Sequence, residues 1–164
     1  VPEPIERSIF VVSASLMLIL MFVLWRPIPA PVWTITNGVA ADAIWLLFGL
    51  GWLTVLLSTF LINHFELFGL SQVWGHARGK PAAEAMFRTP LLYKVVRHPL
   101  YSGFILAFFA SPIMSAGHLL LAIAMLGYIV IAIGHEERDL VAMFGDRYVE
   151  YRGRVGMLVP RRTR

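Results

Sequence analysis

The sequence predicts an all-α integral membrane protein with two full transmembrane helices, a tight helical hairpin and an amphipathic cytoplasmic C-terminal helix. Apolar residues make up 58% of the 164 residues and charged residues only 15%, whereas soluble domains average about 45–50% and about 25%. Long charge-free runs alternate with polar segments, and lysine and arginine are concentrated in two of those segments. These features exclude a disordered chain and argue against an ordinary soluble domain.

Two charge-free runs predict the full spans, at residues 8–25 and 43–63. Each is close to the roughly 20 residues that cross a hydrocarbon core. The first run is too long for the apolar region of a signal peptide. The chain 1–164 is predicted to form a single membrane domain. It begins with Val1 rather than methionine, so either its start has been processed or it is the later part of a longer protein, in which case further spans lie upstream.

A third run without acidic residues, lysine or arginine, 99–134, is too long for one crossing. As a single helix it would extend about 54 Å, against a hydrocarbon core of about 30 Å. Ser111-Pro112 and Gly117 indicate a turn in its middle. We therefore expect a helical hairpin whose arms cover 100–111 and 117–134.

Lysine and arginine predict which segments share a side of the membrane. The loop between the first two spans has one such residue and the hairpin turn has none, but loop 64–98 has five and tail 135–164 has seven. The positive-inside rule places that loop and the tail in the cytoplasm. The hairpin, which crosses twice between them, requires the same arrangement.

The tail carries an amphipathic pattern. Apolar and aromatic residues recur every three or four positions, and charged residues occupy the positions between them. The apolar set is Leu140, Phe144, Tyr148, Tyr151 and Val155. This spacing predicts an amphipathic helix, interrupted at Gly145.

Several kinds of site are excluded or disfavoured by the sequence. The absence of cysteine excludes disulfides, zinc–thiolate sites and thiol nucleophiles. Gly79-Lys80 lacks the earlier glycine of a phosphate-binding loop and is followed by proline. No two of the five histidines have helical metal-ligand spacing, so we expect no metal, and we expect no nucleic-acid partner.

The first candidate site is the segment 93–103. Pro99 suits the first turn of a helix, which places Arg97 and His98 at a helix N-terminus. Such a position binds anions, here a carboxylate. Gly103 permits close approach of another helix or a ligand. The alternative is interfacial, with Arg97 and Tyr101 reaching the membrane surface and His98 acting as a cap.

The second candidate site is His135-Glu136-Glu137-Arg138, where the chain leaves the apolar run. A carboxylate at this depth can bind a ribose hydroxyl pair or an amine, and ionisable residues near membrane depth are functional candidates. The alternative is a solvated acidic segment. The hairpin returns this segment to the first candidate site, so basic, aromatic and acidic groups meet at one mouth.

A third stretch, Asn63–Trp74, is rich in aromatic residues with scattered polar groups. We expect it to help close the same mouth and to contact substrate through His64, Phe68 and Gln72. The alternative is an interfacial helix with an aromatic belt.

Two paired motifs resemble a known family. They are Arg97-His98-Pro99-x-Tyr101-x-Gly103 and, after the apolar hairpin, Glu136-Glu137-x-x-Leu140-x-x-x-Phe144-Gly145-x-x-Tyr148-x-x-Tyr151. This pattern resembles the isoprenylcysteine carboxyl methyltransferase superfamily of membrane enzymes that use S-adenosylmethionine. The stretch Asn63–Trp74, together with Pro2–Arg7 and Trp25–Pro29, resembles its methanethiol S-methyltransferase branch.

The resemblance implies that Tyr93, His98, Tyr101 and Glu136 contact S-adenosylmethionine. From local chemistry we add Arg97, Pro99 and Glu137 as candidate cofactor-binding residues. Prenylcysteine enzymes carry an arginine four residues before that glutamate, whereas this sequence has Ala132, which favours a small uncharged substrate.

The implied reaction is methylation of methanethiol to dimethyl sulfide. A thiol must lose its proton before it attacks, because the thiolate is the nucleophile. His98 and His64 are the candidate catalytic residues for that step, and Glu137 is a weaker candidate. Two alternatives are a methyltransferase that acts on an isoprenoid or lipid headgroup, and a non-catalytic membrane scaffold of the same fold.

Overall fold

The computed structural model describes residues 3–61, 87 and 89–161. By internal contacts the chain divides into two compact units, residues 1–27 with 59–86, and residues 28–58 with 87–164. In the first unit, the described part is mainly helix α1, Glu3–Leu24. The apolar part of α1, Ser8–Leu24, is among the shorter apolar helices of the described residues, so the predicted span 8–25 stays a prediction.

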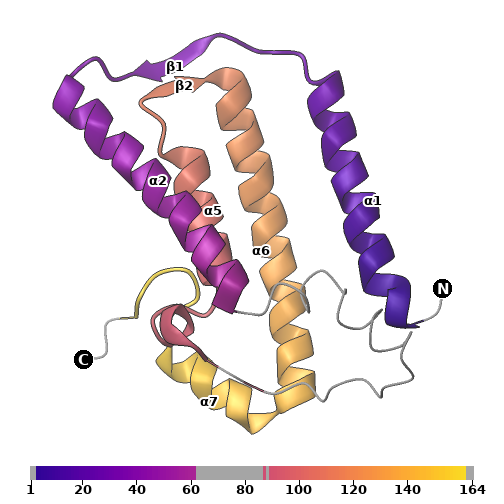
Figure 1. The fold of residues 1–164 in the computed structure, drawn as a ribbon. Coiled ribbons are helices and arrows are strands. Elements are labelled where there is room, and N and C mark those ends of the chain that lie inside the picture. The colour runs from indigo at the N-terminus through magenta and orange to yellow at the C-terminus, as the bar shows by residue number, and fades with distance from the viewer. Residues whose placement is uncertain (1–2, 62–86, 88, 162–164) are drawn as a thin grey trace. The chain divides into compact units, whose positions relative to one another are not determined.

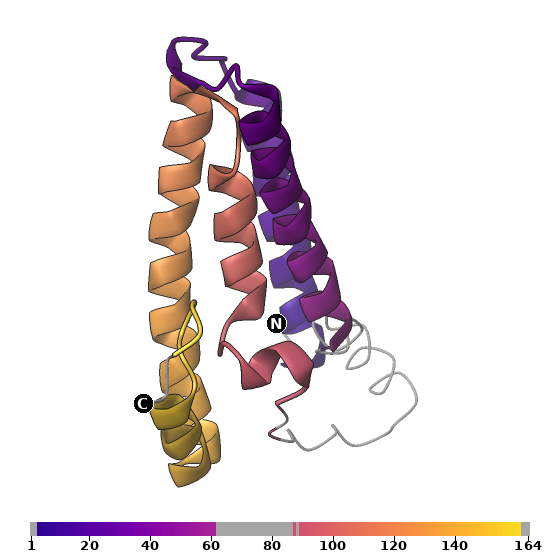
Figure 2. The ribbon, with the colours of Figure 1, turned by 90° about the vertical axis from the view of Figure 1, so that its left-hand side faces the viewer.

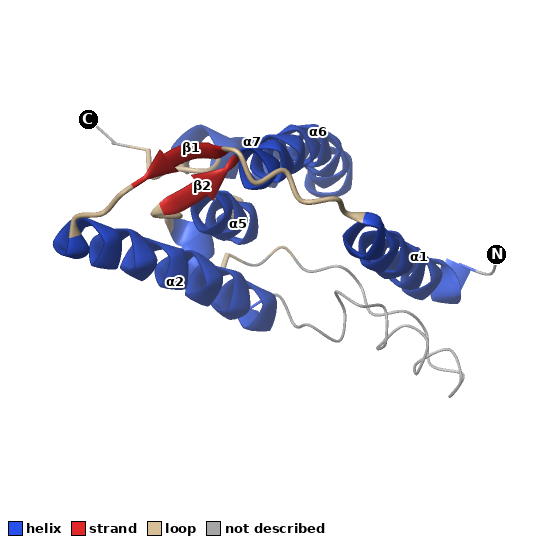
Figure 3. Cartoon of the chain, turned by 90° about the horizontal axis from the view of Figure 1, so that it is seen from above, coloured by secondary structure: helices blue, strands red, loops and turns tan. Residues whose placement is uncertain are grey.

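The second unit contains the remaining described elements (Figures 1 and 3). Strand β1 covers Pro31–Thr34 and strand β2 covers Ile113–Ser115. The helices are α2, Gly38–Leu61, of which residues up to 58 belong to this unit; the short 3₁₀ helix η1, Leu91–Lys94; α5, Pro99–Phe109; α6, Ala116–Phe144; and α7, Asp146–Arg154.

Two of the described helices, α2 and α6, are long and apolar enough to cross a membrane. Only 17% and 22% of the residues in their most apolar stretches are buried. A soluble protein would bury such helices, so these exposed apolar surfaces indicate a membrane protein. The second predicted span, 43–63, corresponds to α2, which begins earlier, at Gly38.

The expected hairpin is formed by α5 and α6, which lie side by side (Figures 1 and 2). Ser111 and Pro112 lie in the turn, and the Ser115 hydroxyl caps α6 by accepting the His118 N–H at 3.2 Å. The second arm was predicted to end at residue 134, but α6 continues to Phe144. The hydropathy of the sequence falls after Gly134, but the helix continues because helix formation does not require apolar residues.

The predicted amphipathic helix is divided by Gly145, as expected. Gly145 has a positive φ of 56° and ends α6, and α7 begins at the next residue. Leu140 and Phe144 therefore lie in α6, whereas Tyr148 and Tyr151 lie buried in α7.

A small antiparallel sheet at the hairpin turn was not predicted. Strand β1 pairs with β2 (Figure 3). The Ile35 N–H donates to the Pro112 carbonyl at 2.9 Å, and the Trp33 indole donates to the Ser111 carbonyl at 2.9 Å. These bonds fasten the segment before α2 to the turn between α5 and α6.

Helix α5 lies between α2 and α6 (Figure 2), and two glycines allow α2 to approach it closely. A Cβ atom on Gly51 would lie 2.7 Å from the Ala107 nitrogen and 2.9 Å from the Gly103 carbonyl oxygen. A Cβ atom on Gly103 would lie 2.7 Å from the Gly51 carbonyl oxygen. Gly103 was expected to admit a helix or a ligand, and here it admits a helix, as small residues do in membrane bundles.

Replacing Gly51 with alanine is expected to destabilise the protein. The added methyl group meets backbone atoms that cannot move aside, and overpacking of this kind costs about 1–3 kcal/mol. The control is Gly49→Ala in the same helix, where a Cβ atom meets nothing within 4 Å. Thermal unfolding in detergent should give a lower Tm for Gly51→Ala and an unchanged or higher Tm for Gly49→Ala; equal values would contradict this packing.

Candidate active site

The candidate residues meet at the open end of the hairpin, opposite the turn that joins α5 and α6 (Figure 1). The start of α5, the charged part of α6, helix α7 and the segment that follows α7 all contribute. All of these elements belong to the second unit. The hairpin therefore brings together the two segments that the sequence predicted to meet.

The segment after α7 pairs with the residues that lead into α5. The Arg97 N–H donates to the Gly156 carbonyl at 2.8 Å, and the His98 N–H donates to the Met157 carbonyl at 3.1 Å. The Ser102 hydroxyl donates to the Leu158 carbonyl at 2.7 Å. The backbone N–H groups of Arg97 and His98 are therefore already hydrogen-bonded within the protein. An anion at this helix start would have to use other donors.

The Arg97 guanidinium is surrounded by acceptors. Its Nε and Nη2 atoms both lie 2.8 Å from Glu137 Oε1. Its Nη1 atom donates to the carbonyls of Arg152 and Val155, at 2.9 and 2.8 Å. The side chains of Arg97 and Glu137 are only 10% and 13% exposed. Charge-assisted bonds of this kind are strong when they are shielded from water, so this ion pair joins α5, α6 and α7.

His98 is the buried N-cap residue of α5, with 4% of its surface exposed. Its Nε2 atom lies 3.2 Å from Glu137 Oε1, and its Nδ1 atom lies 3.6 Å from Glu136 Oε2. Its ring lies 5.8 Å from the ring of Tyr101. The start of α5 at Pro99 agrees with the sequence prediction.

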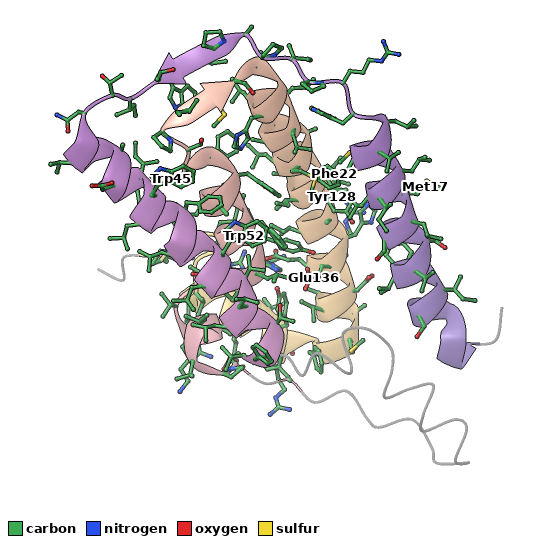
Figure 4. The ribbon with its side chains drawn as sticks, turned by 45° about the horizontal axis from the view of Figure 1, so that its top comes forward. Met17, Phe22, Trp45, Trp52, Tyr128 and Glu136 are labelled. Carbon is green, nitrogen blue, oxygen red and sulfur yellow. The ribbon has the colours of Figure 1, made fainter. Side chains whose placement is uncertain are left out.

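Glu136 differs from its neighbour in exposure, since 46% of its side chain is accessible. It lies two turns beyond Tyr128 on α6 (Figure 4). Its carboxylate interacts electrostatically with the hydroxyls of Tyr93 and Tyr101. The Tyr93 hydroxyl is buried and has no hydrogen-bond partner among the described residues. A buried hydroxyl without a partner costs free energy, so Tyr93 offers an unused hydrogen bond beside Glu136.

An aromatic cluster joins Phe87 to α6 and α7. The Phe87 ring contacts the rings of Phe144, Tyr148 and Tyr151, with centroids 5.3 to 6.0 Å apart. The Tyr151 hydroxyl donates to the Tyr93 carbonyl. Burial raises the pKa of Tyr151 to about 12, although the Arg97 guanidinium opposes that rise. Burial and the nearby Glu137 carboxylate likewise raise the pKa of Tyr148.

A shallow groove lies on the other side of Glu137. Its volume is about 430 Å³, and it is lined by Gly134, Glu137, Arg138, Val141 and Arg152. The sequence did not predict this groove, because its lining residues come from both α6 and α7, and the turn at Gly145 sets how these two helices lie against each other. Arg152, Tyr148 and Tyr151 were likewise not selected as site residues, although the spacing of the two tyrosines on one helical face indicated their burial.

Seven predicted cofactor-binding residues therefore gather at one end of the hairpin. They are Tyr93, Arg97, His98, Pro99, Tyr101, Glu136 and Glu137. Their predicted roles in binding remain predictions. His64, Phe68 and Gln72, predicted to contact substrate, lie outside the described residues.

Loss of the hydroxyl should change the free energy of unfolding differently at the two buried tyrosines of α7. Tyr151→Phe removes a hydrogen bond and should lower the free energy of unfolding by about 0.5–1.5 kcal/mol. Tyr148→Phe, the matched control, removes a hydroxyl without a partner among the described residues and should be neutral or stabilising. Denaturant unfolding at neutral pH measures both, and a larger loss in Tyr148→Phe would contradict these assignments.

The same measurement has a pH dependence. The folded-state pKa of Tyr151, about 12, exceeds the ordinary tyrosine value of about 10. Its contribution to stability is therefore complete below pH of about 10 and is lost as the pH rises through that interval. Tyr151→Phe should accordingly lose less stability than the wild type on alkaline titration.

Known proteins resemble the chain over almost its whole length. A methanethiol S-methyltransferase of Mycobacterium tuberculosis is 54% identical over 160 residues, which cover 98% of this chain and 66% of the relative. Methanethiol S-methyltransferase 2 of Bradyrhizobium diazoefficiens is 55% identical over 163 residues, covering 98% of this chain and 61% of the relative. The chain thus spans less than two thirds of the length of these curated relatives.

A more distant match, a nurim homolog of Drosophila pseudoobscura pseudoobscura, is 29% identical over 141 residues, covering 82% of this chain and 56% of the relative. No family model matches the chain, and no solved structure matches it. The matches at about half identity cover both paired motifs, the apolar hairpin and the segment that follows α7. The chain is therefore similar to methanethiol S-methyltransferases over almost its whole length.

Proposed function

We propose that this chain forms the cofactor-binding part of a membrane methyltransferase that uses S-adenosylmethionine to methylate methanethiol to dimethyl sulfide. The similarity of the chain to methanethiol S-methyltransferases supports this reaction. The observation that carries the site is the meeting of Glu136, His98 and Tyr101 with the Tyr93 hydroxyl at the open end of the hairpin. These groups fit the cofactor, because an accessible carboxylate and a hydroxyl without a hydrogen-bond partner among the described residues lie beside aromatic rings.

The residues divide into binding and positioning roles. Glu136 is accessible, and its carboxylate accepts hydrogen bonds from ribose hydroxyls or from an amine. Tyr93 supplies a hydroxyl, and the rings of His98 and Tyr101 cover the cofactor edge. Arg97 and Glu137 bind each other, so they orient the start of α5 against α6. Pro99, which is buried, fixes the first turn of α5.

S-adenosylmethionine supplies an electrophilic methyl group on a sulfonium. The contribution of the chain is to align the thiol with that methyl group and to exclude water, because transfer to a thiolate removes opposite charges and is favoured in a low-dielectric site. His98 is proposed as the group that receives the thiol proton, with His64 as the alternative. His64, Phe68 and Gln72 are proposed to contact the thiol. Ala132, one turn before Glu136, leaves room without adding a charge.

We further propose that the open end of the hairpin faces the cytoplasm. The excess of lysine and arginine in residues 64–98 and 135–164 supports this orientation. The thiol and the cofactor would then enter from the cytoplasmic side.

The binding role of Glu136 is tested by Glu136→Gln. Loss of a charge-assisted hydrogen bond costs about 1.5–3 kcal/mol, so S-adenosylhomocysteine should bind about tenfold to a hundredfold more weakly. The matched control is Glu150→Gln, since Glu150 is 73% exposed and, among the described residues, pairs with Arg154 one turn away. Calorimetric titration of the protein in detergent measures both, and equal affinity in all three proteins would contradict the assignment.

Substrate choice is tested in membranes that contain the protein, with methyl-labelled S-adenosylmethionine and a panel of acceptors. Labelled dimethyl sulfide should form from methanethiol. Transfer only to an isoprenoid or lipid headgroup would replace the substrate assignment. Binding without transfer to any acceptor would favour the non-catalytic scaffold.

The orientation is tested with single cysteines, which the cysteine-free chain makes simple. Gly38 and Gly153 are suitable sites, because an added Cβ atom at either meets nothing within 4 Å. In intact cells, an impermeant maleimide should label Gly38→Cys and leave Gly153→Cys unlabelled until the membrane is opened. Labelling of both residues from the same side would contradict the proposed topology.

A further inference from the structure

The two nitrogen atoms of His98 face two different carboxylates. Nε2 lies 3.2 Å from Glu137 Oε1, within reach of a bent hydrogen bond, whereas Nδ1 lies 3.6 Å from Glu136 Oε2, beyond hydrogen-bond length. The two carboxylates also differ in their surroundings. Glu137 is 13% exposed and Glu136 is 46% exposed. The imidazole therefore has one side turned to a buried, fixed acid and the other side turned to an accessible one.

Arg97 holds the Glu137 carboxylate in place. Two guanidinium nitrogens lie 2.8 Å from the same carboxylate oxygen, and Arg152 Nη1 lies 3.8 Å from the other oxygen. An arginine remains charged in proteins, so its guanidinium and the Glu137 carboxylate form a charge-assisted pair. An ionised carboxylate can only accept hydrogen bonds.

The proton of a neutral His98 is consequently placed on Nε2. If Nε2 carried a lone pair instead, that lone pair would face a carboxylate oxygen at 3.2 Å. With the proton on Nε2, Nδ1 carries the lone pair and is turned toward Glu136, where the cofactor is proposed to bind. A carboxylate that orients an imidazole in this way fixes which nitrogen accepts a proton.

We propose that Glu137 is a positioning residue that holds the His98 proton on Nε2 and thereby makes Nδ1 the atom that accepts the proton of the thiol substrate. This inference rests on the proposed function. It assigns the general base, and it gives adjacent acids separate roles: Glu136 faces the ligand and Glu137 orients the base.

The proton and the electron pairs balance in this step. The thiol S–H bond breaks as an N–H bond forms at Nδ1, which leaves a thiolate and an imidazolium. The thiolate sulfur forms a bond to the methyl carbon, and the bond between that carbon and the sulfonium sulfur breaks with its electron pair remaining on that sulfur. The imidazolium then releases the proton to water, and Glu136 and Glu137 stabilise its charge while it lasts.

The groups that face His98 set the expected pH dependence. Glu136 and Glu137 approach from α6, Tyr101 from α5, and Tyr93 from η1 lies beside Glu136. The cations are the adjacent Arg97 and, from α7, Arg152. Protonation of His98 or of Glu137 would remove the lone pair or its orienting partner, so the saturated rate should rise with pH.

The tautomer is measured directly by ¹⁵N NMR of the protein labelled at histidine and held in lipid nanodiscs. The His98 resonances are assigned by their loss in His98→Asn. At the pH of the activity assay, the wild type should show a protonated Nε2 and an unprotonated Nδ1. The opposite tautomer, or a doubly protonated ring, would overturn the proposal, and this result needs no variant of Glu137.

Glu137→Gln tests the positioning role. The amide keeps the shape but not the charge, so the His98 tautomers should become mixed and the saturated rate should fall about a hundredfold, in the range of general-base effects. The rise of that rate with pH should be lost in His98→Asn. Affinity for S-adenosylhomocysteine should change less than in Glu136→Gln, and Glu150→Gln should match the wild type throughout.

The outcomes separate this inference from the proposed function. A purely structural Glu137 would lower Tm in Glu137→Gln while the tautomer and the saturated rate of the folded protein stayed unchanged, and that result would overturn the positioning role. A wild-type protein that binds no S-adenosylhomocysteine would instead overturn the proposed function. If Glu137→Gln does not fold, the wild-type tautomer alone still decides the proposal.

Discussion

The ion pair between Arg97 and Glu137 is the interaction on which the open end of the hairpin depends. A buried ion pair is costly to desolvate and is retained only where hydrogen bonds satisfy both partners. Here the Arg97 guanidinium also donates to the carbonyls of Arg152 and Val155. One side chain thus ties the residues before α5 to α6, to α7 and to the segment after α7, and the candidate site is built around that junction.

Two further features keep α2 and α5 in place for the same site. The strands β1 and β2 fasten the turn, and Gly51 and Gly103 allow α2 and α5 to touch along their backbones. The unequal hairpin arms complete the arrangement, because α6 continues beyond its apolar stretch to Phe144. That continuation carries Glu136 and Glu137 to the level of His98.

Features encoded locally could be predicted from the sequence. Pro99 starts α5, Gly145 ends α6, and the length of the third apolar run requires a hairpin. Pairings between distant segments could not be predicted, because neither the β1–β2 register nor the bonds from residues 97 and 98 to residues 156 and 157 leave a local pattern. Arg97 was expected to bind an anionic ligand, since the sequence does not show that Glu137 lies beside it. The continuation of α6 from its apolar part to Phe144 was not predicted, because hydropathy reports lipid contact and not helix formation.

We propose that the cofactor binds on the Glu136 side of α6, against His98, Tyr101 and Tyr93. The most direct measurement is an experimental structure of the protein with S-adenosylhomocysteine bound. We expect its ribose or amine to contact the Glu136 carboxylate and one of its polar groups to bond the Tyr93 hydroxyl. Binding in the groove on the other side of Glu137, between Arg138, Val141 and Arg152, would contradict the account.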